Sequence, residues 1–166
     1  MSKQFKMKGI ESKDGRITLF EERVVFFPPN IITVLGSIHG EGSIPLLRFL
    51  GKRMGRRLVE IWEDKLRPKT LKEITEIVSS MTSTAGWGDV EIKSVSEDEI
   101  VLQLTNNVAE TEDMKARHIC DFLSGYFIGF GEYIFHKAKV YHEKCYITDQ
   151  NNSACEFVIQ KQDVDL

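Results

Sequence analysis

The sequence predicts an α+β protein in which an antiparallel sheet packs against several helices. Three long segments show the spacing of apolar residues that is typical of helices, and paired short segments show the alternation of strands. These segments do not follow the βαβα order of a parallel sheet. At 166 residues the chain is long enough for one domain with a sizeable core. We expect residues 1–15 to form a polar arm and residues 16–166 to form that domain.

The first half of the chain is predicted to contain a β segment followed by three helices. Residues 16–27 are rich in Thr, Val and Phe and end at two prolines, which favours a strand or hairpin. A short helix is expected from residue 30 to 39, and glycines on either side of residue 41 end it. Residues 43–65 carry an apolar stripe, and the capping-box sequence at 70–73 begins the next helix.

The second half is predicted to contain a hairpin, a long helix and a second hairpin. Apolar residues alternate on both sides of an acidic turn within residues 90–104. A helix begins near residues 111–113, where a threonine and acidic residues suit a helix start. Strands over 137–147 and 155–160 are joined by a polar turn.

Composition and charge exclude several classes of protein. The 22 Lys and Arg residues against 25 Asp and Glu residues give a net charge of −3, so direct nucleic-acid binding is not expected. Arg48, Lys52 and Arg56 line one helical face, which we interpret as a solvated face, with binding of phosphate or an acidic partner as the alternative. Apolar runs are too short for a membrane span, and the basic start lacks the apolar core of a signal peptide. A cytoplasmic location with reduced cysteines is therefore expected.

No enzyme motif is found. The sequence has no nucleophile elbow, no zinc-protease motif and no phosphate-binding loop, and its two GxG sequences do not open helices after strands. We therefore predict a protein that is not an enzyme and that binds neither a nucleotide nor haem.

The three cysteines are the sharpest chemical feature. Cys145 and Cys155 should lie side by side in the last hairpin, and Cys120, on the preceding helix, could pack over them. Three thiolates are a plausible part of a tetrahedral zinc site, although the tight CxxC spacing of strong zinc motifs is absent. Buried structural thiols and a reversible disulfide between Cys145 and Cys155 are the alternatives.

The fourth zinc ligand is left open among three residues. His118 is two residues from Cys120 and should point to the opposite side of the helix. Glu143 should share a strand face with Cys145, whereas His142 should lie on the other face.

The last long helix carries more aromatic residues than packing on a sheet usually needs. They form either a plain core stripe or, together with a tryptophan, the wall of an apolar ligand cavity of some 300–1,000 Å³. The residues concerned are Phe122, Tyr126, Phe127, Phe130 and Tyr133, with Trp62 or Trp87.

The region from Cys120 to Ile159 resembles the 4-vinyl reductase domain, a small-molecule-binding module. The resemblance lies in a helix cysteine, two glycines one turn apart, and a hairpin that reads EKC and then ACEFVI. Residues 50–58 are similar to that family's first long helix and residues 23–28 to its opening strand. The resemblance implies a fold shared with TRAPP tethering subunits and haem–nitric oxide sensors.

The same resemblance implies site residues and an assembly. In the zinc-bearing sensors of that family, helix and hairpin cysteines hold the metal, a role that falls by position on Cys120, Cys145 and Cys155. The acidic ligand expected one turn before the helix cysteine is replaced by Arg117. The family's relatives pair through helices, and Gly51 and Gly55 permit close helix approach, so we expect a homodimer with its contact at these glycines.

These observations lead to one functional hypothesis and two alternatives. The first is a stand-alone, regulatory or sensory module that binds a hydrophobic or aromatic small molecule, with zinc as its candidate cofactor. The second is a zinc- or thiol-based redox regulatory protein. The third is a scaffold subunit that resembles the TRAPP tethering proteins.

Overall fold

The computed structural model describes residues 9–111, 117–149 and 151–163, and it has the predicted α+β architecture. The start expected for the last helix at residues 112 and 113 lies outside the described residues. In order, the elements are β1 (Ile10–Lys13), β2 (Arg16–Leu19), β3 (Glu22–Val24), α1 (Asn30–His39), η1 (Gly40–Gly42), α2 (Ser43–Leu66), α3 (Leu71–Thr84), β4 (Asp89–Val95), β5 (Glu99–Thr105), η2 (Val108–Thr111), α4 (Arg117–Phe135), β6 (Ala138–Lys144) and β7 (Cys155–Lys161).

The main sheet is antiparallel, with strand order β4-β5-β7-β6. Of its two central strands, β5 alternates buried and partly exposed residues because one face packs on helices, and β7 keeps this alternation except at Val158, which is also buried. In their register, fully buried side chains oppose one another as the pairs Ile100–Ile159, Leu102–Phe157 and Leu104–Cys155. This face of the sheet forms one side of the hydrophobic core.

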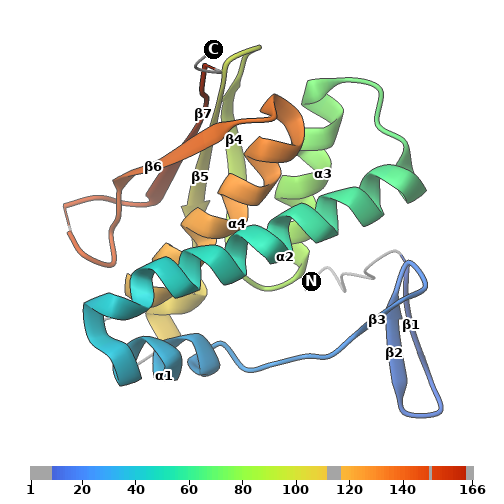
Figure 1. Ribbon diagram of the computed structural model, residues 1–166, viewed down its shortest axis with the longest axis horizontal. Helices are drawn as coiled ribbons and strands as arrows, with labels where there is room; N and C mark the ends of the chain where they lie inside the picture. The colour runs from blue at the N-terminus through green and yellow to red at the C-terminus, as the bar shows by residue number, and fades with distance from the viewer. Residues whose placement is uncertain (1–8, 112–116, 150, 164–166) are drawn as a thin grey trace, which may run out of the picture.

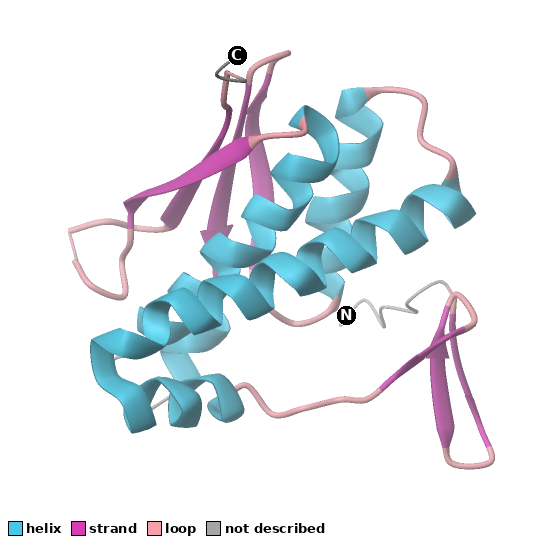
Figure 2. Ribbon diagram, in the orientation of Figure 1, coloured by secondary structure: helices cyan, strands magenta, loops and turns pink. Residues whose placement is uncertain are grey.

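The helices cover that face in two layers. Figures 1 and 2 show α4 and α3 beside the sheet, with α2 crossing α4 on the side away from it. One half of the predicted capping box at the start of α3 is present, since the Glu73 amide donates to Thr70 Oγ1 at 3.1 Å. In place of the other half, Glu73 Oε2 accepts from the amide of Lys69, one residue before the cap. Core side chains from both layers meet on α4, which is buried along almost its whole length.

A second, small sheet lies apart from the main one. Strands β1, β2 and β3 form a three-stranded antiparallel unit, and an extended stretch joins it to α1 (Figure 1). Residues 10–13 were expected in a polar arm, but they pair with β2. The reason is the turn between them, where Asp14 and Gly15 both have positive φ, as a tight hairpin turn requires.

The α2–α4 crossing brings two backbones into direct contact. A Cβ on Gly51 would collide with the carbonyl oxygen of Phe122, and one on Gly55 with that of Tyr126. From the opposite side, Gly125 and Gly129 face α2 backbone in the same way. The close approach predicted for Gly51 and Gly55 therefore exists, but it joins two helices of one chain. Both glycines are buried, so their assignment as a dimer contact is corrected.

Within the described residues, no helix has the length and apolar character needed to cross a membrane.

Candidate metal centre

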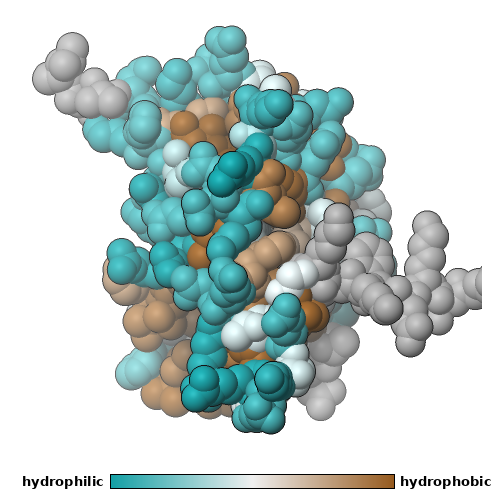
Figure 3. Space-filling model, turned by 90° about the vertical axis from the view of Figure 1, so that its right-hand side faces the viewer, coloured by the Kyte–Doolittle hydropathy of each residue, from teal (hydrophilic) through white to brown (hydrophobic). Residues whose placement is uncertain are grey.

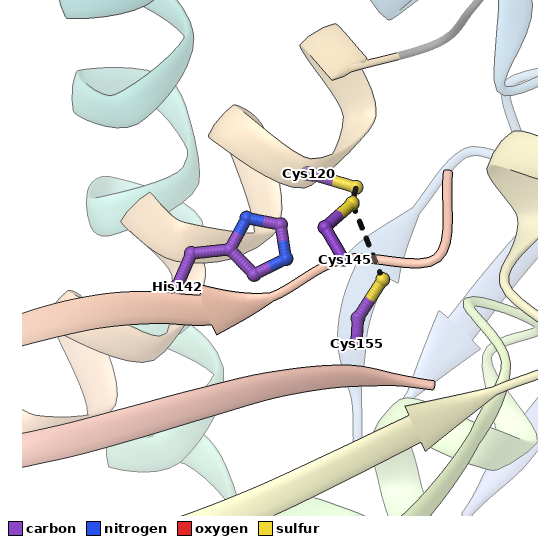
Figure 4. Close-up of side chains that lie close together, drawn as sticks. All are labelled: Cys120, His142, Cys145 and Cys155. Carbon is purple, nitrogen blue, oxygen red and sulfur yellow. Dashed lines mark hydrogen bonds between the residues drawn. The ribbon is translucent and has the colours of Figure 1, made fainter. Parts of the chain in front are cut away.

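Three cysteines and one histidine meet at the edge where α4 covers the last hairpin. Cys120 comes from α4, His142 from β6, Cys145 from the turn after β6, and Cys155 from the first position of β7 (Figure 4). One potential ligand atom from each residue lies within 4.8 Å of all the others. The structure therefore brings together the three cysteines that the sequence singled out, with one of the three candidates for a fourth ligand.

The turn after β6 holds Cys145 in place. Its carbonyl oxygen accepts from the backbone amides of Thr148 and Asp149, at 3.2 and 2.8 Å. The Asp149 carboxylate in turn accepts from the Asn151 amide at 3.0 Å, which closes the polar turn that leads to β7. The predicted strand over 137–147 is thus too long at its end, because residues 145–147 form this turn.

His142 reaches the cysteines against the expectation from strand alternation. The pairing of β6 with β7 shifts register between His142 and Lys144, so the regular two-residue alternation ends before Cys145. The imidazole stacks on Phe157, with 4.5 Å between ring centroids and 3° between planes. The placement of His142 on the face away from Cys145 is therefore corrected.

Of the other two candidates for a fourth ligand, one lies elsewhere on α4 and the other has a side chain that the structure does not describe. His118 packs its ring against Gly36 of α1, on another side of α4 from Cys120, as helical spacing predicts. The side chain of Glu143 lies outside the described part of the structure.

Asn107, which the sequence analysis did not single out, binds the cluster from the side. Its Nδ2 donates to Cys120 Sγ and to Cys155 Sγ, both at 3.7 Å, and the residue is buried. Its Oδ1 accepts from the Ala109 amide at 3.0 Å, which fixes the side-chain orientation. Donors to thiolate sulfur are a usual part of the surroundings of metal-binding cysteines. A polar residue just after a buried strand was the only sequence signal for this role.

The three thiols share protons unequally. Hydrogen bonds from Cys120 and Cys155 lower the pKa of Cys145 far below its ordinary value, because Cys145 accepts from both. The bonds to Cys145 and Cys155, with burial, raise the pKa of Cys120. For Cys155, the bond with Cys120 lowers the pKa, but the bond to Cys145 and burial outweigh it and raise the pKa to about 11. The cluster thus favours one thiolate, at Cys145.

These distances and this donor set fit a zinc ion. With Zn–S bonds of about 2.3 Å, tetrahedral geometry puts neighbouring sulfurs roughly 3.8 Å apart. The Sγ atoms of Cys120 and Cys145 are 3.8 Å apart, and those of Cys145 and Cys155 are 3.6 Å apart. The Nε2 atom of His142 is buried and has no hydrogen-bond partner in the described structure, so it is available as a metal ligand. A Cys₃His set is a known donor set of structural zinc.

A cavity of about 630 Å³ opens beside the cluster. Cys120, His142 and Cys145 form one part of its wall. Arg48 and Arg117 bring positive charge to it, and Arg48 binds the buried Asp121 carboxylate at 3.2 Å. Its volume is that of a typical small-molecule site, and its lining is more polar than the predicted apolar cavity.

The aromatic residues predicted to line a ligand cavity lie in the core. Phe122, Tyr126, Phe127, Phe130 and Trp62 are buried, and Tyr133 and Trp87 are partly buried beside them. Trp87 stacks on Phe122 with 5.2 Å between ring centroids, and Phe127 packs on Phe157 at 4.9 Å. None of the seven lines the cavity beside the cysteines, so the structure places them as a core stripe.

Comparison with known proteins shows the fold. No protein-family model matches the chain, and no curated protein matches its sequence. Among solved structures, the phenol-responsive sensory domain of the transcription activator PoxR, with phenol, has a TM-score of 0.77 at 13% identity. The likeness covers 92% of this chain and 85% of that domain.

Two further structures carry the same fold. Subunit 3 of the trafficking protein particle complex from Naegleria fowleri, covalently bound to palmitic acid, has a TM-score of 0.60 at 14% identity, over 81% of this chain and 90% of that one. An H-NOX protein from Shewanella oneidensis in the Fe(II)NO state has a TM-score of 0.54 at 12% identity, over 84% and 78%. The fold relation implied by the sequence resemblance is therefore confirmed.

Proposed function

We propose that this chain is a sensory domain of the 4-vinyl reductase type that binds a small molecule and holds one zinc ion. The observation that carries the proposal is the Cys₃His cluster, whose sulfur separations of 3.6 and 3.8 Å match the edges of a zinc tetrahedron. Cys120, His142, Cys145 and Cys155 would hold the ion. Its role is structural, since four protein ligands leave no open position for substrate. The proposal assigns binding and not catalysis.

The small molecule is assigned to the cavity beside the zinc centre. Its wall holds Asp149, the ion pair of Arg48 with Asp121, Arg117 and the ring of Tyr141. Arg117 and the Tyr141 ring would suit an aromatic compound with a phenolic or carboxylate group. The PoxR domain, which shares the fold, is described as phenol-responsive, and its structure contains phenol. Since the small molecule would contact the cavity wall formed by Cys120 and His142, its binding would alter the surroundings of the metal-binding residues.

Metal titration of ligand variants tests the zinc assignment. We expect Cys120→Ser and His142→Ala to weaken zinc binding strongly, whereas His39→Ala, at an exposed histidine on α1, should leave it unchanged. Zinc binding should release protons and weaken at acid pH, because bound cysteines are thiolates. Equal zinc affinity in all three variants would overturn the assignment.

A thermal-shift titration tests the ligand assignment. We expect phenol and benzoate to raise the unfolding temperature in a saturable way, by mass action on the folded state. Arg117→Ala should weaken this response tenfold or more, while Arg53→Ala, an exposed arginine away from the cavity, should not. A flat response to both compounds in the wild-type chain would remove the small-molecule assignment and favour the scaffold alternative.

A redox role is the second candidate, and the Sγ separation of 3.6 Å between Cys145 and Cys155 supports it. Oxidation would join these sulfurs and transfer two electrons and two protons to a peroxide or disulfide oxidant. Treatment with hydrogen peroxide followed by mass analysis should then show a reversible loss of two hydrogens in metal-free protein. A zinc-loaded chain that resists this treatment would leave zinc as the sole role of the cluster.

A further inference from the structure

The cavity beside the candidate metal centre has a wall that carries charges of both signs. Two arginines, Arg48 and Arg117, and two aspartates, Asp121 and Asp149, line it. The formal charges of these four side chains cancel. The cysteines and the histidine of the wall belong to the candidate metal centre, and the other lining residues are neutral. The rest of the wall therefore has separated charges and no net charge.

Two of the four charges neutralise each other and leave one acceptor unused. Arg48 Nη2 donates to Asp121 Oδ1 at 3.2 Å, and the side chain of Asp121 is 7% exposed. The second carboxylate oxygen, Asp121 Oδ2, is buried and has no hydrogen-bond partner among the described residues. Buried polar atoms are nearly always paired, because an unpaired one costs free energy. Since Asp121 forms part of the cavity wall, a molecule in the cavity that carries a donor can supply this bond.

Arg117 provides the second positive charge of the wall. It begins α4 and lies four residues before Asp121, a spacing that allows an ion pair on one face of a helix. Asp121 binds Arg48 instead, and within the described ranges no carboxylate pairs with Arg117. A guanidinium group whose donors are unused is a good receptor for a carboxylate, which it can bind through two parallel hydrogen bonds.

Asp149 provides the second negative charge, from the turn after β6. Its Oδ1 accepts from the backbone amide and from Nδ2 of Asn151, at 3.0 and 2.9 Å. Its Oδ2 accepts from Asn152 Nδ2 at 3.3 Å. These donors are all neutral, so they orient the carboxylate without cancelling its charge. A cationic group in the cavity would meet a carboxylate that is already held in place.

A second cavity, of about 340 Å³, shows the contrast. It lies between the β2–β3 turn and the second half of α2, which Figure 1 places on the right and Figure 3 presents to the viewer. Hydrophilic side chains cover much of that face in Figure 3. The wall of this cavity has four carboxylates and two cations, and both cations are already paired, Arg57 with Glu22 and Lys65 with Glu21. It therefore offers no cation to a ligand, unlike the cavity beside the metal centre.

We propose that the small molecule beside the metal centre is a zwitterion, an aromatic amino acid whose carboxylate binds Arg117 and whose ammonium group binds Asp121 and Asp149. The inference rests on the proposed function, because it names the ligand class of the same cavity. A compound with a carboxylate alone meets two aspartates of like charge, and one with an ammonium group alone leaves Arg117 unpaired. A zwitterion matches both signs and, like the wall, has no net charge. Its aromatic side chain would contact the ring of Tyr141.

Three compounds that differ by one charged group test the proposal on the zinc-loaded protein. L-Phenylalanine carries both groups, hydrocinnamate lacks the ammonium group, and phenethylamine lacks the carboxylate. Calorimetric titration should show that L-phenylalanine binds more tightly than either of the other two by about tenfold or more, because each added contact is a hydrogen bond to a charged group.

Variants assign each contact to its residue. Arg117→Ala should weaken the binding of L-phenylalanine and hydrocinnamate by about tenfold and leave phenethylamine unchanged. Asp149→Asn and Asp121→Asn should each weaken L-phenylalanine and phenethylamine but not hydrocinnamate. Asp89→Asn, at an exposed aspartate outside the cavity, is the matched control and should change none of the three. Damage to the fold would weaken all three compounds together, so this pattern separates charge recognition from a structural effect.

Two kinds of result would overturn the proposal, and they differ in what they leave standing. If phenol, benzoate or hydrocinnamate binds and L-phenylalanine binds no more tightly, the ligand is not a zwitterion, while the small-molecule assignment stands. The same conclusion follows if the preference for L-phenylalanine persists in the Arg117 variant and in both aspartate variants. If none of these compounds binds to the wild-type chain, the zwitterion and the small-molecule assignment fail together.

Discussion

Asn107 ties the candidate metal centre to the surrounding backbone. Its Nδ2 donates to two sulfurs, its Oδ1 accepts from the Ala109 amide, and its own amide donates to the Tyr146 hydroxyl at 2.7 Å. Sulfur that accepts such bonds carries its negative charge at lower free-energy cost, so the thiolates become better metal ligands.

We therefore expect Asn107→Ala to lower zinc affinity by about 10–100-fold without abolishing binding. Competition with a chromophoric chelator measures this change. Asn151→Ala, an exposed amide in the turn before β7, is the control. If the two variants bind zinc equally well, Asn107 has only a structural role.

The buried hydroxyl of Tyr126 makes the stability of the fold depend on alkaline pH. Burial raises the pKa of this residue, with the hydrogen bond between its hydroxyl and Thr82 Oγ1 at 3.3 Å acting in the opposite direction. In the unfolded chain a tyrosine ionises near pH 10, whereas folded Tyr126 holds its proton there. Its contribution is therefore complete below about pH 10 and is lost as the pH rises further.

Denaturant unfolding between pH 8 and pH 11 checks this sign. The wild-type free energy of unfolding should fall more steeply above pH 10 than that of Tyr126→Phe. Tyr141→Phe, at an exposed ring, should follow the wild type. Parallel curves for all three proteins would mean that Tyr126 ionises freely in the folded state.

Among single residues, the sequence predicted the three cysteines of the candidate metal centre but not the positions of His142 and Asn107 beside them. With only three cysteines in 166 residues, each of them draws attention wherever it lies. His142 was placed on the wrong face because the alternation rule assumes a regular strand, and the register shift before Lys144 is set by pairing with β7. The role of Asn107 depends on a contact between segments that are distant in sequence, and the spacing of nearby residues does not predict such contacts.

Among the elements, the crossing of α2 and α4 is the contact with least tolerance for change. Four glycines let the two backbones touch, and any side chain there meets a carbonyl group that cannot move aside. Overpacking of this kind typically costs 1–3 kcal/mol and occasionally more.

Gly55→Leu should accordingly destabilise the monomer fold by at least about 3 kcal/mol, and Gly55→Ala by about 1–3 kcal/mol. Thermal and urea unfolding measure both changes. Gly42→Ala is a matched control, because a Cβ there meets open space, and it should be neutral or slightly stabilising. A fully stable Gly55→Leu that is merely monomeric would restore these glycines to a dimer contact.

The start of α3 offers a smaller, well-defined test. Thr70 Oγ1 accepts from the Glu73 amide and satisfies one of the free donors at the helix start. Thr70→Ala should lower the free energy of unfolding by about 1 kcal/mol, and Thr70→Ser should recover most of it. A loss below about 0.3 kcal/mol would show that α3 is held by its packing alone.

The elements themselves were predictable, since their signals are local. Helical stripes, the capping box and alternating strands marked α2, α3, β5 and β7 in the sequence. The partner of a glycine row or an aromatic row was not predictable, because periodicity defines a face and not what covers it. The aromatic residues of α4 thus form a core stripe, and the glycines of α2 pack against the backbone of α4 in the same chain.

At the scale of the whole molecule, the candidate metal centre joins the helical layers to the sheet. Cys120 lies on the helix that carries the α2 crossing, and the other three ligands lie on or beside β6 and β7. An ion bound only by the folded chain adds to its stability in proportion to the logarithm of its concentration, by roughly 4 kcal/mol at a thousandfold excess over Kd. Removal of the metal by a chelator should therefore lower the unfolding temperature and loosen the last hairpin before the rest of the fold.

Native mass spectrometry of protein purified without chelator, compared with the same sample denatured, tests the central claim most directly. The account predicts one zinc ion per 19.0 kDa chain in the native spectrum. In the denatured sample the zinc should be lost, and all three thiols should then react with an alkylating agent. Cys145→Ser should show no zinc under the same conditions. A native wild-type spectrum free of metal, with three thiols that stay reduced and titrate freely after denaturation, would contradict the account and leave the cysteines as buried structural residues.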